Sequence, residues 1–122
     1  MKILATDMDG TFLDHLGAYD KARLDNLLDA CEAKDYVFTV ASGRALLALE
    51  ELFDGFVDRI AIIAENGALV QYKGEVLFES KLDPKDYLKI ADTTLALPTC
   101  EGILLSGRRG AYAPNRCRSS LS

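Results

Sequence analysis

Two carboxylates stand two residues apart near the start of the chain, in the run Asp7-Met8-Asp9-Gly10-Thr11. Like charges this close repel unless a cation lies nearby, and Mg²⁺ prefers carboxylate oxygens as ligands. The same ion neutralises a phosphate, so that an anionic nucleophile can approach phosphorus. The pair therefore predicts a Mg²⁺-assisted phosphoryl-transfer site, with Asp7 as the nucleophile and Asp9 as the general acid and base.

Asp-Gly pairs also simply close turns, so the elements around the acids decide between the two readings. Lys2 to Thr6 is a short β-type run that stops at Asp7, a pattern typical of a buried parallel strand that delivers an acid to its carboxyl end. Gly10 permits a tight exit from that strand and a close approach of the backbone to an anion. This context favours chemistry, and we expect Met8, between the acids, to belong to the phosphate-binding residues.

A second candidate anion site is Ser42-Gly43-Arg44, which follows a strand and opens a helix. Free backbone N–H groups and the positive end of a helix dipole suit a phosphate, and the Ser42 hydroxyl and Gly43 N–H are the expected donors. A plain helix N-cap at Ser42 is the alternative. Arg44 either clamps the substrate or lies at the surface. Asn66 ends the third strand at the same sheet edge, where it either contacts substrate or only forms a turn.

The elements that must position these residues alternate between strand and helix, which predicts right-handed βαβ units in a parallel sheet. His15 follows the acids in a polar loop, and we expect it to be solvated. The pattern predicts strands at 36–41 and 59–64, helices starting at Asp20 and spanning 45–53, a β-hairpin at 68–79 around Lys73-Gly74, a helix after Asp83-Pro84, and short strands at 103–106 and 111–113.

Composition limits the class of protein. The chain has 122 residues, of which 49% are apolar and 27% charged, with a formal net charge of −5. These values exclude intrinsic disorder, and the longest apolar stretches, of which 60–64 is one, are too short to span a membrane. Residues 107–122 hold four Arg and no acid, leaving 10 basic and 19 acidic residues, a net of −9, in residues 1–106. An acidic body argues against nucleic-acid binding. We expect a cytoplasmic protein with three free thiols at Cys31, Cys100 and Cys117.

Three motifs together resemble a known family. The runs Asp7-Met8-Asp9-Gly10-Thr11-Phe12-Leu13, Ala41-Ser42-Gly43-Arg44 and Glu65-Asn66-Gly67-Ala68 resemble the haloacid dehalogenase (HAD) superfamily and, within it, the Cof-type, subfamily IIB branch of sugar-phosphate phosphatases. The resemblance implies an α/β fold: a partial Rossmann-like parallel sheet with helices on both faces, followed by the start of an α/β cap. It also implies Mg²⁺ held by Asp7 and the backbone carbonyl of Asp9, an aspartyl-phosphate intermediate and a small phosphorylated metabolite as substrate.

The chain departs from that branch because a later catalytic Lys and a further acidic motif are missing. We therefore expect residues 1–80 to form the first part of the core, 81–113 part of the cap, and 114–122 an irregular tail, in a truncated or frameshifted member. An incomplete protein that binds phosphate or Mg²⁺ weakly, or self-associates through the exposed edge of the first strand, is the alternative function. A response-regulator receiver domain is a third reading, but Ala64-Glu65-Asn66 holds no Asp where that fold needs one.

Overall fold

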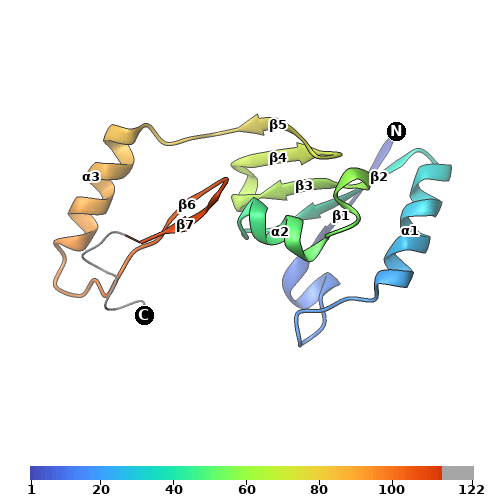
Figure 1. The fold of residues 1–122 in the computed structure, drawn as a ribbon, viewed down its shortest axis with the longest axis horizontal. Helices are drawn as coiled ribbons and strands as arrows, with labels where there is room; N and C mark the ends of the chain where they lie inside the picture. Colours follow the sequence, from blue (N-terminus) through green and yellow to red (C-terminus); the bar gives the residue numbers. More distant parts are fainter. Residues whose placement is uncertain (114–122) are drawn as a thin grey trace. The chain divides into compact units, whose positions relative to one another are not determined.

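The computed structural model of the chain describes residues 1–113 and divides into two compact units, Met1–Ser80 and Lys81–Ser122 (Figure 1). The tail predicted for 114–122, with Cys117, lies outside the described residues. Cys31 and Cys100 are free thiols, as expected.

The first unit is built on a five-stranded sheet in the order β1-β2-β3-β4-β5 (Figure 1). β1 (Lys2–Asp7), β2 (Tyr36–Ala41) and β3 (Ala61–Ala64) are parallel, and β4 (Leu69–Tyr72) and β5 (Glu75–Glu79) add an antiparallel hairpin. Lys73 and Gly74 both have positive φ, 50° and 83°, as a two-residue hairpin turn requires. The α/β class, the parallel strand order and the hairpin therefore agree with the prediction.

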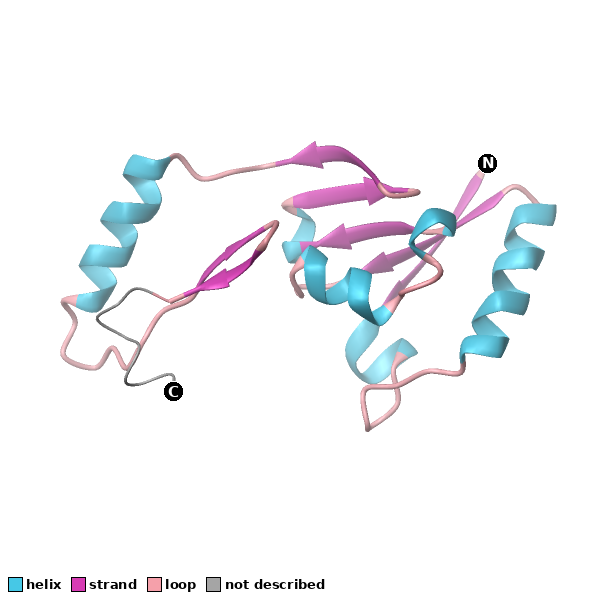
Figure 2. Cartoon of the chain, in the orientation of Figure 1, coloured by secondary structure: helices cyan, strands magenta, loops and turns pink. Residues whose placement is uncertain are grey.

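Two helices connect the parallel strands (Figure 2). α1 (Lys21–Ala33) begins after Asp20, whose carboxylate accepts hydrogen bonds from the N–H groups of Ala22 and Arg23. α2 (Leu46–Leu52) has Ala45 as its N-cap, without a side-chain hydrogen bond. A helix N-cap at Ser42 is therefore wrong: the helix begins later, and three residues separate Ser42 from its first turn.

The core lies on one face of the sheet. Phe38 and Val40 are two residues apart on β2, and Val40 pairs with Ile62 on β3. These three buried side chains therefore lie on the same face of the sheet. α1 and α2 both pack in this cluster, through Leu24 and Leu49 among others. The fold class is the expected one, but among the described residues both packed helices cover the same face, because successive right-handed crossovers to β2 and then β3 run in one direction across the sheet.

Aromatic side chains close the core at the loop between β1 and α1. The rings of Phe12 and Tyr19 lie 5.3 Å apart, and that of Tyr19 lies 5.2 Å from Phe53. The Tyr19 hydroxyl donates a hydrogen bond of 2.7 Å to the Leu52 carbonyl at the end of α2, and burial raises the pKa of this phenol. This packing ties the loop that follows the two acids to the body of the unit.

β1 is the exposed edge of the sheet. It pairs with β2 over its full length, and within residues 1–113 it has no second strand beside it. Ile3 is 69% exposed and Leu4 41% exposed, although both are apolar strand residues. The unpaired first strand expected from the sequence is therefore present among the described residues.

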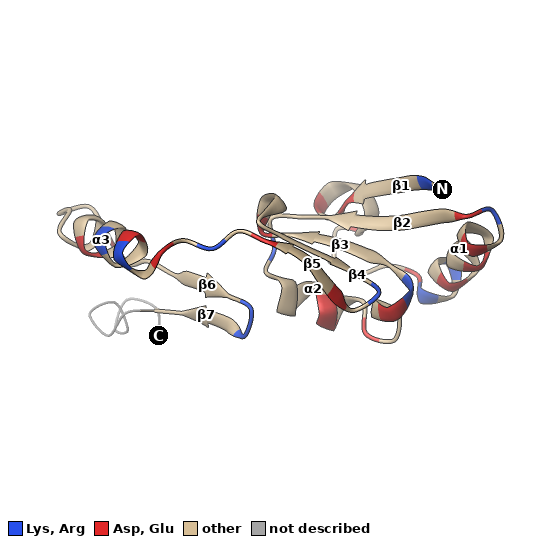
Figure 3. Cartoon of the chain, turned by 90° about the horizontal axis from the view of Figure 1, so that it is seen from above, with Lys and Arg blue, Asp and Glu red and all other residues tan. Residues whose placement is uncertain are grey.

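A single arginine fastens α1 to the segment before β3. Arg59 donates to the carboxylates of Asp25, Asp29 and Glu32 at 2.7, 2.7 and 2.8 Å. The Arg59 hydrogen bond lowers the pKa of Glu32, and the hydrogen bond to Glu32, followed by that to Asp25, raises the pKa of Arg59. The three acids lie on α1, which carries both acidic and basic residues (Figure 3). This Arg59 clasp joins elements that are far apart in the sequence.

The second unit contains α3 (Pro84–Leu95) and the two-stranded hairpin of β6 (Leu105–Gly107) and β7 (Gly110–Tyr112). Asp83 caps α3 by accepting from the Lys85 N–H, with Pro84 in the first turn. The strands differ slightly from the prediction because Gly107 pairs with Gly110, so the strands run into the glycines and leave a two-residue turn. Of the described residues of this unit, Ala91 is the buried apolar one.

Candidate active site

Asp7 lies at the carboxyl end of β1, beside Ala41 at the end of β2. Its side chain is exposed, and its Oδ1 accepts a hydrogen bond of 2.8 Å from the Met8 N–H. Its Oδ2 has no hydrogen-bond partner among the described residues. One carboxylate oxygen is thus oriented by the backbone while the other faces solvent, which suits a nucleophile or a metal ligand.

The chain leaves β1 through a tight turn that carries Asp9. Asp9 has φ −68° and ψ 125° and Gly10 has φ 75° and ψ 0°, the angles of a type II β-turn. A side chain at Gly10 would meet no atom within 4 Å, so glycine is needed there for its positive φ and not for space. Met8 is fully buried and its carbonyl accepts from the Leu13 N–H at 3.0 Å, which anchors the turn.

Met8 was predicted to bind phosphate. The structure places its side chain in the core and directs its N–H to the Asp7 carboxylate. A phosphate approaching this N–H would have to share it with Asp7.

Backbone hydrogen bonds join the loop after β2 to the turn after β3. The Ser42 N–H donates to the Ile63 carbonyl at 2.9 Å, and the Ser42 carbonyl accepts from the Asn66 N–H at 3.1 Å. The Glu65 N–H donates to the Arg44 carbonyl at 3.0 Å. The predicted residues Ser42, Arg44 and Asn66 therefore lie together at one edge of the sheet.

Gly43 lies against the side chain of Asn66. A Cβ at Gly43 would come within 2.9 Å of Asn66 Oδ1 and 3.2 Å of its Nδ2. Any residue larger than glycine would have to displace the amide. Sequence reasoning assigned Gly43 a donor role through its N–H; the close approach to Asn66 is a second requirement that no local pattern revealed.

The turn after β3 is held in a rare backbone conformation. Glu65 and Asn66 have φ values of 53° and 55°, followed by Gly67 at 98°. Residues other than glycine rarely adopt this left-handed backbone conformation, and such backbone strain is concentrated at functional sites. The Asn66-Gly67 pair in the sequence predicts a turn here, whereas no sequence pattern predicts the positive φ of Glu65.

Arg44 reaches across to Asp9. Its Nη2 lies 2.6 Å from Asp9 Oδ1 and its Nε donates to Asp9 Oδ2 at 3.4 Å. The two side chains are 37% and 70% exposed. The sequence offered Arg44 as a substrate clamp or a surface residue, and neither reading included this contact, which joins residues 35 positions apart.

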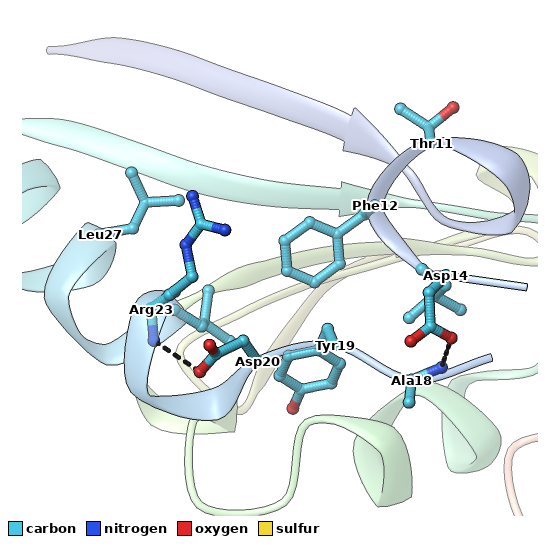
Figure 4. Close-up of a pocket in the computed structure, with 10 residues that line it drawn as sticks. Thr11, Phe12, Asp14, Ala18, Tyr19, Asp20, Arg23 and Leu27 are labelled. Carbon is cyan, nitrogen blue, oxygen red and sulfur yellow. Dashed lines mark hydrogen bonds between the residues drawn. The ribbon is translucent and has the colours of Figure 1, made fainter. Parts of the chain in front are cut away.

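One hollow of the first unit is lined by residues other than the two acids. It is lined by the loop after β1 and by α1, with the ring of Phe12 between the loop and the side chains of Arg23 and Leu27 (Figure 4). Its lining includes Thr11 and Asp14 but neither Asp7 nor Asp9. Asp7 and Asp9 are both exposed. His15 lies in the same loop and is exposed.

The donor set for a metal is small. Among residues 1–113, no group of three or more His, Cys, Asp or Glu side chains is arranged to hold an ion. The free carboxylate oxygen of Asp7 and the backbone carbonyl oxygen of Asp9 are hard donors, and Mg²⁺ commonly takes one or two carboxylates together with water and substrate phosphate. The donor type at this edge thus fits Mg²⁺, with most of the coordination left to water and substrate.

No helix among the described residues is long and apolar enough to cross a membrane.

Comparisons with known proteins agree on one family. A family model described as haloacid dehalogenase-like hydrolase matches residues 4–120. The chain is 32% identical over 112 residues to the 5-amino-6-(5-phospho-D-ribitylamino)uracil phosphatase YbjI of Escherichia coli K12. That match covers 92% of this chain and 41% of the relative.

Solved structures show the same fold. The SMU.1108c protein of Streptococcus mutans UA159 matches 98% of this chain and 46% of its own, with a TM-score of 0.81 and 30% identity. The HAD subclass IIB sugar phosphatase BT4131 matches 98% of this chain and 47% of its own, with a TM-score of 0.64 and 22% identity, a likeness of fold alone. The chain spans less than half the length of these relatives.

Proposed function

Because the chain belongs to the haloacid dehalogenase-like hydrolases, we propose that it carries the nucleophilic half of a Mg²⁺-dependent phosphatase acting on a sugar phosphate or a similar small metabolite. The single observation that carries this proposal is the position of Asp7, at the carboxyl end of β1 with one oxygen held by the Met8 N–H and the other facing solvent. The cytoplasmic location expected from the sequence stays a prediction.

The proposed reaction has two steps. The free Asp7 oxygen attacks phosphorus, the bond from phosphorus to the leaving oxygen breaks, and Asp9 gives that oxygen a proton. Water then attacks the phosphorus of the aspartyl phosphate while Asp9 takes a proton from that water. The bond between phosphorus and the Asp7 oxygen breaks, which releases phosphate and restores Asp7. Both acids follow one strand and are separated by one residue, so they face the same substrate.

Other residues at the sheet edge are proposed to bind the phosphate and the metal. The Ser42 hydroxyl and the Gly43 N–H, in the loop before α2, are the proposed donors for phosphate oxygens, with Asn66 beside them. The Asp7 carboxylate and the backbone carbonyl of Asp9 would hold Mg²⁺, whose charge would offset that of the phosphate and the acids. We further propose that the second unit is the beginning of a cap that shapes the substrate pocket, in keeping with the family match that extends through it.

The test is hydrolysis of p-nitrophenyl phosphate by the chain, with Mg²⁺ and with EDTA. We expect Mg²⁺-dependent turnover, and at least a thousandfold loss in Asp7→Asn, because the amide cannot attack phosphorus. Asp58→Asn is the matched control, since it removes the same charge from an exposed residue before β3. Turnover that survives Asp7→Asn would contradict the proposal.

A second candidate function is binding without turnover. Lys2 and Lys73 lie at the opposite end of the strands from Asp7, where their ammonium groups lie over the rings of Tyr36 and Tyr72. They therefore do not supply the catalytic lysine that the family resemblance implies beside the acids. β1 also presents Ile3 and Leu4 on an exposed edge, which favours self-association by strand pairing. A folded chain that forms dimers and binds phosphate, yet shows no turnover, would support this function over the first.

A further inference from the structure

We propose that Arg44 is a positioning residue that holds Asp9 ready for proton transfer, and that it does not bind the substrate phosphate. The inference rests on the proposed function, since it assigns Asp9 the role of general acid. It is carried by the geometry of the two loops that meet at the end of the sheet.

Asp9 needs an external support. Its side chain is 70% exposed, and it lies in a turn whose next residue is Gly10. Asp7 is oriented by the Met8 N–H, whereas the Asp9 carboxylate is contacted by the Arg44 guanidinium. An exposed carboxylate on such a turn would otherwise sample several rotamers, and a general acid must stay within hydrogen-bond reach of the leaving oxygen.

Arg44 is suited to supply that support because its backbone is fixed on both sides. Its N–H donates to Ser42 Oγ at 3.1 Å, and its carbonyl accepts from the Glu65 N–H at 3.0 Å. Glu65 in turn belongs to the strained turn after β3. The backbone of Arg44 is therefore held by the loops after β2 and β3, and its guanidinium extends from this fixed point to the turn after β1.

The contact also uses the guanidinium fork. Nη2 lies 2.6 Å from Asp9 Oδ1 and fixes that oxygen, whereas Nε makes only a long contact of 3.4 Å to Oδ2, which leaves this oxygen free to carry the proton. A guanidinium engaged in this way has turned its edge toward the acid. Clamping a phosphate would require Arg44 to release Asp9 at the moment when Asp9 must be in place.

The test compares kcat/KM for two substrates that differ in their need for a general acid. The leaving group of p-nitrophenyl phosphate departs without a proton, whereas β-glycerophosphate needs one. In Arg44→Gln we expect kcat/KM to fall about a hundredfold for the second substrate and about tenfold or less for the first, because general acid catalysis contributes about 10²-fold or more. Arg44→Lys keeps the charge without the fork and should give an intermediate ratio.

Arg59→Gln is the matched control, because it removes an arginine of equal charge that holds three carboxylates away from the site. We expect it to leave the ratio between the two substrates unchanged. A rise in KM of equal size for both substrates in Arg44→Gln would overturn the proposal and assign Arg44 to the phosphate.

A second measurement does not depend on turnover. Three-bond couplings across the Asp9 side chain, measured by NMR, should report one χ1 rotamer in the unaltered chain and averaging in Arg44→Gln. If Asp9 is already averaged in the unaltered chain, or keeps one rotamer in Arg44→Gln, the inference is wrong. A chain without turnover in which Arg44→Gln releases Asp9 would contradict the proposed function and the role in proton transfer, and would leave only the positioning of Asp9 by Arg44 supported.

Discussion

The two units of the chain bury their apolar residues to very different extents. In the first unit a continuous cluster from the sheet, α1 and α2 is shielded from water, and Leu49, Phe53 and Ile62 have no exposed surface. In the described part of the second unit, Leu88 and Ile90 of α3 are more than half exposed, at 55% and 56%, and so is Leu104. Apolar burial is the main favourable contribution to folding, so stability resides in the first unit.

This difference matches the distribution of candidate chemistry. The predicted nucleophile, acid and phosphate donors all lie in the first unit, on loops that leave a packed sheet. Rigid strands position such loops far better than an element without a core. The described part of the second unit is a helix and a hairpin whose apolar side chains are largely exposed to solvent. Such exposure is typical of a part that packs against further protein surface.

The largest expected effect is on stability, in a pair of leucine substitutions. Leu49→Ala removes a fully buried side chain and should lower the free energy of unfolding by about 2–5 kcal/mol. Leu88→Ala removes an exposed side chain and should change it by less than about 0.5 kcal/mol. Urea unfolding followed by circular dichroism measures both values. Equal losses would show that α3 packs in a core as complete as that of the first unit, which would break the comparison.

A pair of glycine substitutions gives a smaller effect. Gly10→Ala forces a side chain into a positive φ of 75° and should destabilise the first unit by about 1 kcal/mol. Gly110→Ala meets a similar restriction at φ 140°, but it lies in a hairpin of the second unit. We expect global unfolding to respond to the first change and not to the second. A shift of the urea midpoint in Gly110→Ala as large as that in Gly10→Ala would mean that the two units unfold together.

Loss of the Arg59 clasp should have the smallest effect, and that effect should depend on pH. The Arg59 hydrogen bond lowers the pKa of Glu32 below its ordinary 4.5, so the stabilisation is present above that value and is lost as the pH falls through the lowered pKa. Arg59→Gln should therefore lower the urea midpoint modestly at neutral pH. The difference from the unaltered chain should disappear in acid.

Asp35→Asn serves as the comparison for that titration, because its carboxylate pairs with the exposed amino terminus instead of Arg59. A midpoint difference for Arg59→Gln that stays constant down to acid pH would show that the arginine acts through its aliphatic packing and not through the carboxylates.

Much of the fold could be predicted because local signals agree with tertiary packing. The strand that stops at Asp7, the cap at Asp20 and the Lys73-Gly74 turn are each determined by residues within a few positions. The start of α2 was predicted within one residue, at 45 instead of 46, but its N-cap could not be placed, because Ala45 caps the helix without a side-chain hydrogen bond and so leaves no mark in the sequence.

The candidate site was predictable as a set of residues but not as a set of contacts. The strand order brings Asp9, Arg44 and Asn66 to one sheet edge, and motif spacing is sufficient to say so. Which side chains touch depends on loop conformations of about an ångström's precision. The packing of Gly43 against Asn66 and the fork between Arg44 and Asp9 are therefore properties that emerge only with the structure.

The most direct test of the central claim is a single-turnover reaction in water labelled with heavy oxygen, with the enzyme in excess over substrate. If Asp7 attacks phosphorus and water then attacks the phosphorus of the aspartyl phosphate, the released phosphate should carry one labelled oxygen and Asp7 should remain unlabelled. The decisive readout is a covalent phosphate on the Asp7 peptide after acid quench, found by mass spectrometry and missing in Asp7→Asn. Turnover with no phosphorylated Asp7 peptide, or with the phosphate on another residue, would contradict the account.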